Sequence, residues 1–468
     1  MTAMKIRFLG GIRQVTGSKF YLETPDSRVL VDCGLYQERP YLSRNWQPFP
    51  VPPEDIESIL LTHAHLDHCG YIPRLSADGF KGRILATPPT AELARIILLD
   101  SAHIQEEDAA FKKKRHAKEG RKGPHPEIPL YTIGDAEHAI LAFEPVAYEK
   151  RIVLGRRTSV VFHDAGHILG SSMLQVESGE GAAVRRIVFS GDIGRWDSPL
   201  VQDPSVFSRA DYVVMESTYG DRDHEDPEPI ESLLARIINE TAGIGGKVLM
   251  PVFAMERAQE VLYYLGKLLR AKRIPPLPVI MDSPMAVEIT KVFERYPSYL
   301  DEEAKAIVRS GRSLFQFPGL RLTPTMADSK AVNDMEGPAV ILAGSGMATG
   351  GRIKHHLKYN IGRPETTVLF VGYQAQGTLG RIILDGAKEI RLFGAMLPVR
   401  SRIVRITGFS AHAGKRELRR WLNAFDVRPR KLFIAHGDEN VSLAFAAELR
   451  SEGWRAVVPR YGEEFDLD

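Results

Sequence analysis

The sequence predicts an α/β protein of two domains, one inserted into the other. Its first half consists of short apolar runs separated by turns, whereas apolar strands alternate with helices from about residue 220. From about residue 400 a strand, helix, strand pattern returns, which indicates that the last segment completes the first domain. At 468 residues the chain can bury two cores. The expected segments are 1–217 and 401–468 for the first domain and 218–400 for the insertion.

The first domain is expected to be rich in short strands. Apolar runs bounded by turn residues predict strands over 5–9, 19–23, 29–31, 58–61, 159–162, 173–176, 186–189 and 212–215. Residues 90–107 carry apolar side chains at helical spacing, so a helix is expected there.

The inserted segment alternates between the two kinds of element. Strands are predicted over 247–251, 279–281, 339–343 and 367–371, and helices over 257–270, 286–294 and 352–359. Because strands that alternate with helices usually pair in parallel, this segment predicts a parallel sheet flanked by helices.

Bulk composition excludes several classes of protein. Hydrophobic residues make up 44% and charged residues 26%, so neither a disordered nor a membrane protein is indicated. The two cysteines, Cys33 and Cys69, provide no disulfide framework, and a cytoplasmic location is expected. Because the net charge is only +2, any surface that attracts a polyanion must be local.

One such local surface is predicted between residues 112 and 122. This stretch holds seven cations, opposed by Glu119 alone. A solvated helix end with its loop and a phosphate-attracting patch both remain open as explanations. The seven cations are Lys112, Lys113, Lys114, Arg115, Lys118, Arg121 and Lys122.

The strongest chemical signal follows the predicted strand 58–61. His63, His65, Asp67 and His68 lie within six residues, which places four metal-competent side chains together. His63 and His65 are two apart, so in extended backbone they point the same way. Imidazole with carboxylate suits zinc, with manganese as the alternative ion. This spacing argues against a polar loop with accidental histidines.

The His-x-His-x-Asp-His pattern resembles the signature of the metallo-β-lactamase fold. Three further residues match that family's pattern in order: Asp32 in Val-Asp-Cys-Gly, His167 in Ala-Gly-His-Ile, and Asp192 in Ser-Gly-Asp-Ile. The resemblance implies a four-layer αββα sandwich for the first domain.

The rest of the chain resembles the β-CASP nucleases. It looks most like the nuclease subunit of messenger-RNA 3′-end processing and its prokaryotic relatives, over nearly the whole length. Glu256 departs from the family, in which Gly is usual at this place. The matching motifs are Glu216-Ser217-Thr218-Tyr219-Gly220, Pro251-Val252-Phe253-Ala254, Asp282-Ser283-Pro284-Met285-Ala286, Gly344-Ser345-Gly346-Met347, Gly350-Gly351-Arg352, Gly372-Tyr373-Gln374, Gly408-Phe409-Ser410-Ala411-His412 and His436-Gly437-Asp438-Glu439.

The resemblance implies two zinc ions per chain and a set of ligands. One ion would be held by His63, His65 and His167, and the other by Asp67, His68 and His436. Asp192 would bridge the two ions, and Asp32 would hydrogen-bond a ligand or the nucleophile. These roles make Asp32, Asp67 and Asp192 catalytic candidates.

Two more residues are candidates for proton transfer. His412 is the expected general acid, oriented by Glu216, because hydrolysis of a phosphodiester needs a proton for the leaving oxygen. A helix-capping or ligand role for His412 is the alternative.

A glycine-rich segment follows the predicted strand 339–343 and precedes a helix. Backbone N–H groups in such a turn can hold a phosphate, although a plain strand-to-helix turn has the same composition. The phosphate-contacting candidates are Ser345, Gly346, Met347, Arg352 and His355.

The expected function is a metal-dependent ribonuclease that cuts single-stranded RNA in a cleft between its domains. Endonucleolytic cutting is expected, exonuclease action and a homodimer are left open, and no membrane partner is expected. A DNA-processing nuclease of the same fold, a small-molecule hydrolase and a non-catalytic RNA-binding scaffold are the alternatives.

Overall fold

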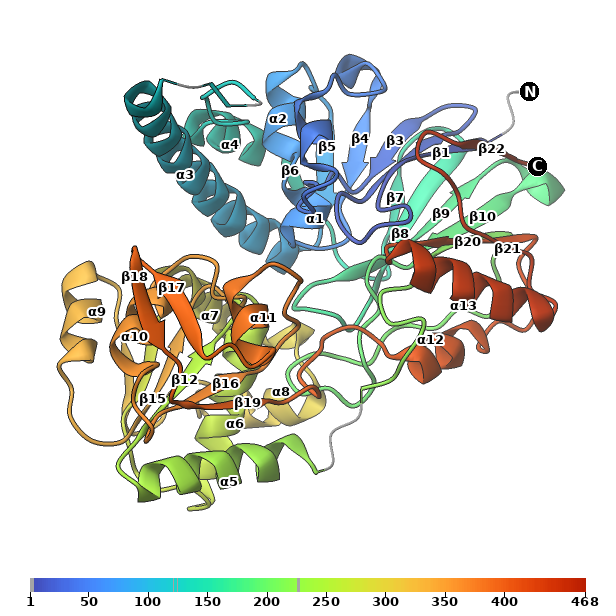
Figure 1. Ribbon diagram of the computed structural model, residues 1–468. Helices are drawn as coiled ribbons and strands as arrows, with labels where there is room; N and C mark the ends of the chain where they lie inside the picture. Colours follow the sequence, from blue (N-terminus) through green and yellow to red (C-terminus); the bar gives the residue numbers. More distant parts are fainter. Residues whose placement is uncertain (1–3, 121, 124, 225–227) are drawn as a thin grey trace. The chain divides into compact units, whose positions relative to one another are not determined.

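The computed structural model describes residues 4–120, 122–123, 125–224 and 228–468. Its chain divides into two compact units (Figure 1). The first unit comprises Met1–Asp223 and His412–Asp468, and the second comprises His224–Ala411. In the described ranges no helix has the length and apolar composition that crossing a bilayer requires. Arg121, one of the predicted basic residues, lies outside the described residues.

Two seven-stranded sheets form the centre of the first unit, as far as the structure describes it. In spatial order the first sheet is β22 (Glu464–Leu467), β1 (Met4–Gly10), β2 (Lys19–Glu23), β3 (Arg28–Val31), β4 (Ser58–Leu60), β5 (Arg83–Ala86) and β6 (Phe143–Pro145). The second is β21 (Ala456–Val457), β20 (Lys431–Ala435), β11 (Tyr212–Glu216), β10 (Arg185–Phe189), β9 (Ser172–Ser178), β8 (Thr158–Asp164) and β7 (Arg151–Val153).

Side chains that alternate along a strand of this unit face two different hydrophobic cores. In β10, Ile187 and Phe189 enter the core between the sheets, while Val188 enters a second core against helices. Successive strand side chains point to opposite faces, so one strand serves both cores. The helices are α1 (Leu66–Cys69), α2 (Ile72–Ala77), α3 (Pro88–Glu119), α4 (Ile133–Ile140), α12 (Lys415–Leu422) and α13 (Glu439–Ser451).

Helices cover both outer faces, which confirms the predicted αββα sandwich. Figure 1 shows α2, α3 and α4 beside the first sheet and α12 and α13 beside the second. On the second side, Trp421 of α12 and Phe445 of α13 are buried against Met215 of β11. The last segment of the chain therefore contributes both strands and helices to the first unit.

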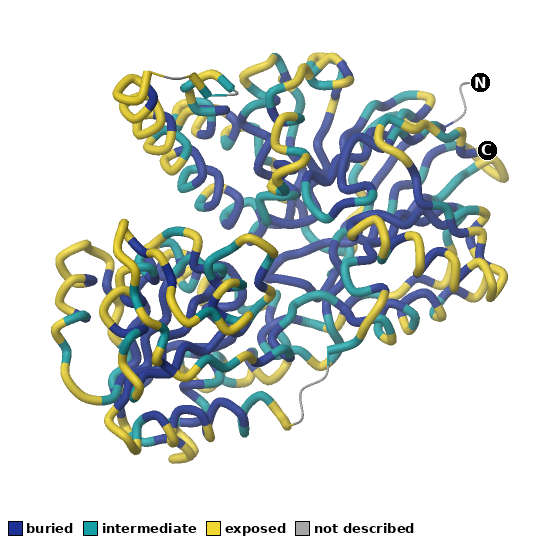
Figure 2. The backbone as a smooth tube through the Cα atoms, in the orientation of Figure 1, coloured by how far each residue is buried: buried dark blue, intermediate teal, exposed yellow. Residues whose placement is uncertain are grey.

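Helix α3 extends twelve residues past its predicted end at residue 107, to Glu119. Figure 2 shows its second half to be largely exposed, so no apolar periodicity marks it in the sequence. The i,i+4 pairs Asp108–Lys112 and Arg115–Glu119, each 3.9 Å apart, support this part instead. Most of the predicted basic segment is thus helical rather than loop.

The second unit contains the predicted parallel sheet flanked by helices. Within its described residues the order is β14 (Leu320–Leu322), β13 (Val279–Asp282), β15 (Ala339–Ala343), β12 (Lys247–Pro251), β16 (Thr367–Phe370) and β19 (Arg402–Arg405), all pairs parallel. A hairpin of β17 (Glu389–Leu392) and β18 (Ala395–Pro398) is separate. The helices are α5 (Ile230–Gly243), α6 (Arg257–Arg270), α7 (Pro284–Arg295), α8 (Glu302–Arg309), α9 (Met326–Asn333), α10 (Ile353–Asn360) and α11 (Leu379–Leu384).

The second unit extends beyond the boundary predicted after residue 400. Strand β19 lies past that boundary and pairs with β16, and Ile403 packs on the core of the second unit. The division between the units falls between Ala411 and His412. The prediction stopped early because a four-residue edge strand carries too little apolar pattern to be assigned to one sheet or the other.

Glu256 has a backbone conformation that glycine adopts more readily than a residue with a side chain. Its φ is 65° and its ψ is −59°, and the N–H of Arg257 donates to the carbonyl of Met255 at 2.8 Å. These features define a γ-turn with positive φ, which is strained for a residue that has a Cβ atom. The turn leads directly into α6.

We expect the Glu256→Gly variant to be more stable than Glu256→Ala by about 1–2 kcal/mol. Both variants lose the carboxylate, so their difference isolates the backbone strain from the side-chain contacts. Thermal unfolding followed by calorimetry measures the difference. An alanine variant as stable as the glycine variant would show that the turn is unstrained.

Candidate metal centre

Parallel strand pairing brings the predicted ligands to one edge of each sheet. Strands β3 and β4 are parallel, so Asp32 and His63 leave their strands side by side. Strands β10, β11 and β20 are also parallel, which does the same for Asp192, Glu216 and His436. Carboxyl ends of neighbouring parallel strands meet at the same sheet edge. Strand order therefore brings together Asp192, Glu216 and His436, which are far apart in sequence.

The first cluster consists of three histidines facing one oxygen of Asp192. Nε2 of His63 lies 3.0 Å from Nδ1 of His65, and Nε2 of His167 lies 3.3 Å from that same nitrogen. Oδ2 of Asp192 lies 3.4 Å from Nε2 of His63 and 3.5 Å from Nε2 of His167. His63, His167 and Asp192 are buried, and His65 is half-buried.

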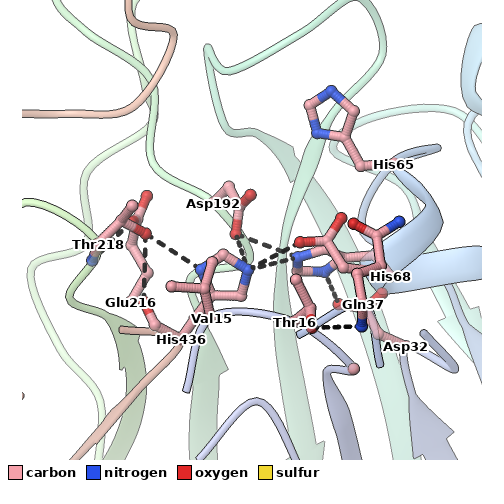
Figure 3. Close-up of polar contacts among 12 residues, drawn as sticks. Val15, Thr16, Asp32, Gln37, His65, His68, Asp192, Glu216, Thr218 and His436 are labelled. Atoms are coloured by element: carbon pink, nitrogen blue, oxygen red, sulfur yellow. Dashed lines mark hydrogen bonds and ion pairs between the residues drawn. The ribbon is translucent and has the colours of Figure 1, made fainter. Parts of the chain in front are cut away.

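The second cluster faces the other oxygen of Asp192. Nε2 of His68 and Nε2 of His436 lie 3.0 Å apart, and each approaches Oδ1 of Asp192, at 3.3 and 3.6 Å. Oδ2 of Asp67 lies 3.5 Å from Nε2 of His436. Figure 3 shows Asp192 between His436 and His68. The carboxylate of Asp192 thus stands between the two clusters.

These residues fit a pair of metal ions. Ligand atoms about 2.0–2.1 Å from a tetrahedral ion are about 3.3 Å from one another, close to the separations observed here. Oδ1 of Asp192 is buried and accepts no hydrogen bond within the described part of the chain. A buried carboxylate oxygen without a donor is costly unless a cation reaches it.

Burial and mutual charge set the protonation of the clusters. Burial lowers the pKa of His63 well below its usual value and that of His65 to about 4, so both rings are neutral. Burial alone would raise the pKa of Asp192, but His436, His68 and His63 hold it well below its usual value. Burial at His68 and His436 is outweighed by Asp192, which raises the pKa of both rings, so each of these two must lose its proton to bind a metal ion.

A network behind the ligands fixes their orientation. Asp32 accepts hydrogen bonds from the backbone N–H and the hydroxyl of Thr62, and its Oδ2 lies 2.7 Å from Nδ1 of His68 (Figure 3). Oγ1 of Thr218 lies 3.1 Å from Nδ1 of His436. Such partners set the tautomer and the ring orientation of a metal-binding histidine.

The two threonines, Thr62 and Thr218, were not among the functional residues predicted from sequence. Thr62 stands directly before the histidine motif and Thr218 lies inside the Glu-Ser-Thr-Tyr-Gly motif. Their adjacency to proposed ligands is the only signal that could have found them. The backbone at Asp32 and His436 has φ of 57° and 45°, which a sequence does not reveal for residues other than glycine.

His412 joins the centre from the start of the last segment. Its Nδ1 lies 3.2 Å from Oε1 of Glu216 and 3.9 Å from Oδ2 of Asp192. Burial lowers the pKa of His412, but Glu216 and Asp192 outweigh it and raise this pKa to about 9. Glu216 is itself held because it accepts the backbone N–H of Ile193 at 2.6 Å.

Close backbone contact places His412 beside the other ligand loops. Gly194 forms a bridge with His412, and a Cβ atom at Gly194 would lie 1.7 Å from the carbonyl oxygen of Gly166. Only glycine permits this approach, which brings together the loops that carry His167, Asp192 and His412.

The glycine-rich segment predicted to contact phosphate belongs to the second unit. The hydroxyl of Ser345 accepts the N–H of Gly350 at 3.2 Å, which closes the segment on itself. A Cβ atom at Gly346 would lie 2.6 Å from the ring of Phe253. The carbonyl of Met347 accepts the N–H of Gly380 at 3.0 Å. These contacts are internal to the second unit.

Arg352 and His355 also have partners inside the second unit. NH1 of Arg352 donates to Oδ1 of buried Asp282 at 2.7 Å, and NH2 donates to the carbonyl of Pro324 at 3.2 Å. His356 lies 2.6 Å from the same carboxylate. The ring of His355 is exposed and stacks on Phe393. A phosphate contact by any of these residues stays a prediction.

Three family descriptions match successive parts of the chain. Residues 21–192 match a metallo-beta-lactamase superfamily domain, and residues 258–383 match a Beta-Casp domain. Residues 396–459 match a Zn-dependent metallo-hydrolase RNA specificity domain.

Individual relatives match along nearly the full length. A protein named ribonuclease from Thermus thermophilus is 38% identical over 98% of this chain and 99% of its own length. The transcription termination factor FttA of Methanocaldococcus jannaschii is 34% identical over 96% of this chain and 69% of its own length. A crystal structure of an Enterococcus faecalis protein of unknown function shares the fold, with a TM-score of 0.57, 12% identity and coverage of 99% and 100%. The chain therefore belongs to the metallo-β-lactamase superfamily, among the proteins that carry an inserted β-CASP domain.

Proposed function

We propose that this protein is a zinc-dependent ribonuclease that hydrolyses phosphodiester bonds of single-stranded RNA. The observation that carries the proposal is the convergence of six metal-competent side chains, as two clusters, on a seventh, Asp192. This centre lies in a chain that is 38% identical to a named ribonuclease over almost its whole length. Two zinc ions per chain are proposed, with manganese as the alternative.

The ligand sets follow the two clusters. His63, His65 and His167 would hold one ion, Asp67, His68 and His436 would hold the other, and Asp192 would touch both. When bound, the ions would supply Lewis acidity that lowers the pKa of water and offsets negative charge on the phosphate.

The residues around the ligands have separate roles in this proposal. Asp32 holds the ring of His68, and Thr218 holds that of His436, so the ligand nitrogens keep their direction. Glu216 holds Nδ1 of His412, which leaves Nε2 as the ring nitrogen to donate a proton to the leaving oxygen.

Elemental analysis and strand digestion together test the proposal. Purified protein should contain two metal ions per chain and should cut end-labelled single-stranded RNA faster than single-stranded DNA. Fewer than one ion per chain, with no gain after reconstitution, would contradict the metal centre. Equal cutting of DNA would favour the DNA-processing alternative, and binding without cutting would favour a scaffold.

The basic end of α3 provides a test of how RNA is attracted. Lys112, Lys113 and Lys114 are exposed, and the first of them pairs with Asp108 only loosely, at 3.9 Å. Replacing all three with serine should weaken RNA binding and reduce the slope of log affinity against log salt by roughly 0.7 per lost phosphate contact. The rate of the chemical step should not change, because none of the three is a proposed ligand or acid.

Binding titrations at several salt concentrations measure this slope. Lys150→Ser serves as the control, because Lys150 is an exposed lysine of the same unit that lies outside the basic segment. A slope unchanged in the triple variant would favour the view that this end of α3 is merely solvated.

A further inference from the structure

An exposed aromatic ring stands at the tip of the hairpin in the second unit. Phe393 follows β17, Gly394 precedes β18, and Leu392 pairs with Ala395, so these two residues form the whole turn. The side chain of Phe393 is 52% exposed. Ile390 and Leu392 are buried in the core of this unit, so they anchor the hairpin and fix the position of its tip.

The backbone at this tip is unfavourable for phenylalanine. Phe393 has φ of 49° and Gly394 has φ of 84°. A two-residue turn with both φ values positive favours Asn-Gly or Asp-Gly. A bulky residue in the left-handed region is uncommon and costly, and such outliers cluster at functional sites. The fold alone gives no reason for an aromatic ring here.

Three side chains of helix α10 lie close to the ring of Phe393. The ring of His355 stacks on Phe393 with centroids 4.7 Å apart and planes at 29°. Nζ of Lys354 lies 5.4 Å and Nζ of Lys358 lies 5.9 Å from the Phe393 centroid. The helix has no acidic residue, and Figure 1 shows it beside the hairpin. Burial, with His356, Lys358 and Lys354, lowers the pKa of His355, so its ring is neutral at pH 7.

We propose that Phe393, with His355, Lys354 and Lys358, forms a platform on which a base of single-stranded RNA stacks. Aromatic side chains bordered by cations bind single strands in this way, since every base has a π-face and every linkage carries a charge. The proposal rests on the proposed function, because it assumes that RNA is the ligand. It gives His355 a base-stacking role in place of the phosphate contact expected from sequence.

Asparagine suits the backbone of this turn better than phenylalanine does, and it has no aromatic ring. A Phe393→Asn variant can therefore remove the ring without a loss of stability. Phe393→Asn should keep or raise the thermal stability, since asparagine tolerates the left-handed conformation. The same variant should bind a single-stranded oligoribonucleotide about five- to hundredfold more weakly. Phe393→Tyr keeps a stacking ring and should bind as the parent does.

An abasic strand of the same length separates stacking from charge. All variants are made in an Asp192→Asn background so that the strand is not cut, and fluorescence anisotropy measures binding. The parent should prefer the base-bearing strand, and Phe393→Asn should lose this preference while binding the abasic strand unchanged. Met396→Asn is the matched control, because Met396 is 58% exposed on the same hairpin and lies outside the stack.

Equal affinity of Phe393→Asn and its parent for the base-bearing strand would overturn the platform. Equal losses on both strands would also overturn it, since they would indicate a change in charge or fold. The same variants are also made in protein that keeps Asp192, and their hydrolysis of bis(p-nitrophenyl) phosphate reports on the metal centre alone. Failure of the platform is therefore distinguishable from failure of the proposed function.

Discussion

Replacing Asp192 with asparagine should lower the rate of RNA hydrolysis by about 10³-fold or more. The two oxygens of Asp192 face different clusters, at 3.4 Å from His63 and 3.3 Å from His68. An amide at this place loses the negative charge and directs N–H groups towards one cluster. The rates are measured on end-labelled RNA, with the metal content determined in the same samples.

Asp197→Asn is the matched control for this variant. Asp197 lies five residues further on, is exposed, and has φ of 56°, a conformation that asparagine adopts readily. It should retain full activity and both ions. A near-parental rate for Asp192→Asn would show that another residue connects the two clusters.

Replacing His412 with alanine should lower the rate by about 10²–10⁴-fold, the usual contribution of a general acid. Both metal ions should stay bound, because no cluster ligand is removed. The loss should shrink on a p-nitrophenyl phosphodiester, since p-nitrophenolate leaves without a proton. His138→Ala, at an exposed position in α4, provides the control.

Metal content decides between the two roles of His412. If the ions are lost together with the activity, His412 is a ligand. If the ions stay but the better leaving group brings no recovery, a donor other than His412 protonates the leaving oxygen. Either result contradicts the assignment of His412 as the acid, and neither contradicts the presence of a metal centre at this site.

Local sequence pattern was sufficient for much of the fold. Strand β12 and helix α6 coincide with their predicted bounds, because buried parallel strands and amphipathic helices have strong apolar patterns. The exposed half of α3 was missed, and strand β19 was assigned to the wrong domain, because exposed or edge elements have little such pattern. The hairpin that carries Phe393 was missed for a related reason, since its turn has a residue that propensity disfavours.

The sequence by itself determined the chemistry of the metal centre. His63, His65, Asp67 and His68 lie within six residues after a strand, and the spacing of the two histidines directs both side chains to one side. Their residue types limit the ions to those that accept nitrogen and oxygen ligands. These properties depend only on neighbouring residues, which is why they are visible in sequence.

Only the tertiary structure decided which distant residues complete that centre and what orients them. His68 and His436 are 368 positions apart, and they meet because His68 follows β4 of the first sheet, His436 follows β20 of the second, and the two sheets pack on a common core. The same packing places Thr62 and Thr218 behind the ligands and leaves Phe393 exposed beside α10. Strand order and backbone conformation depend on the whole core, so no local pattern carries them.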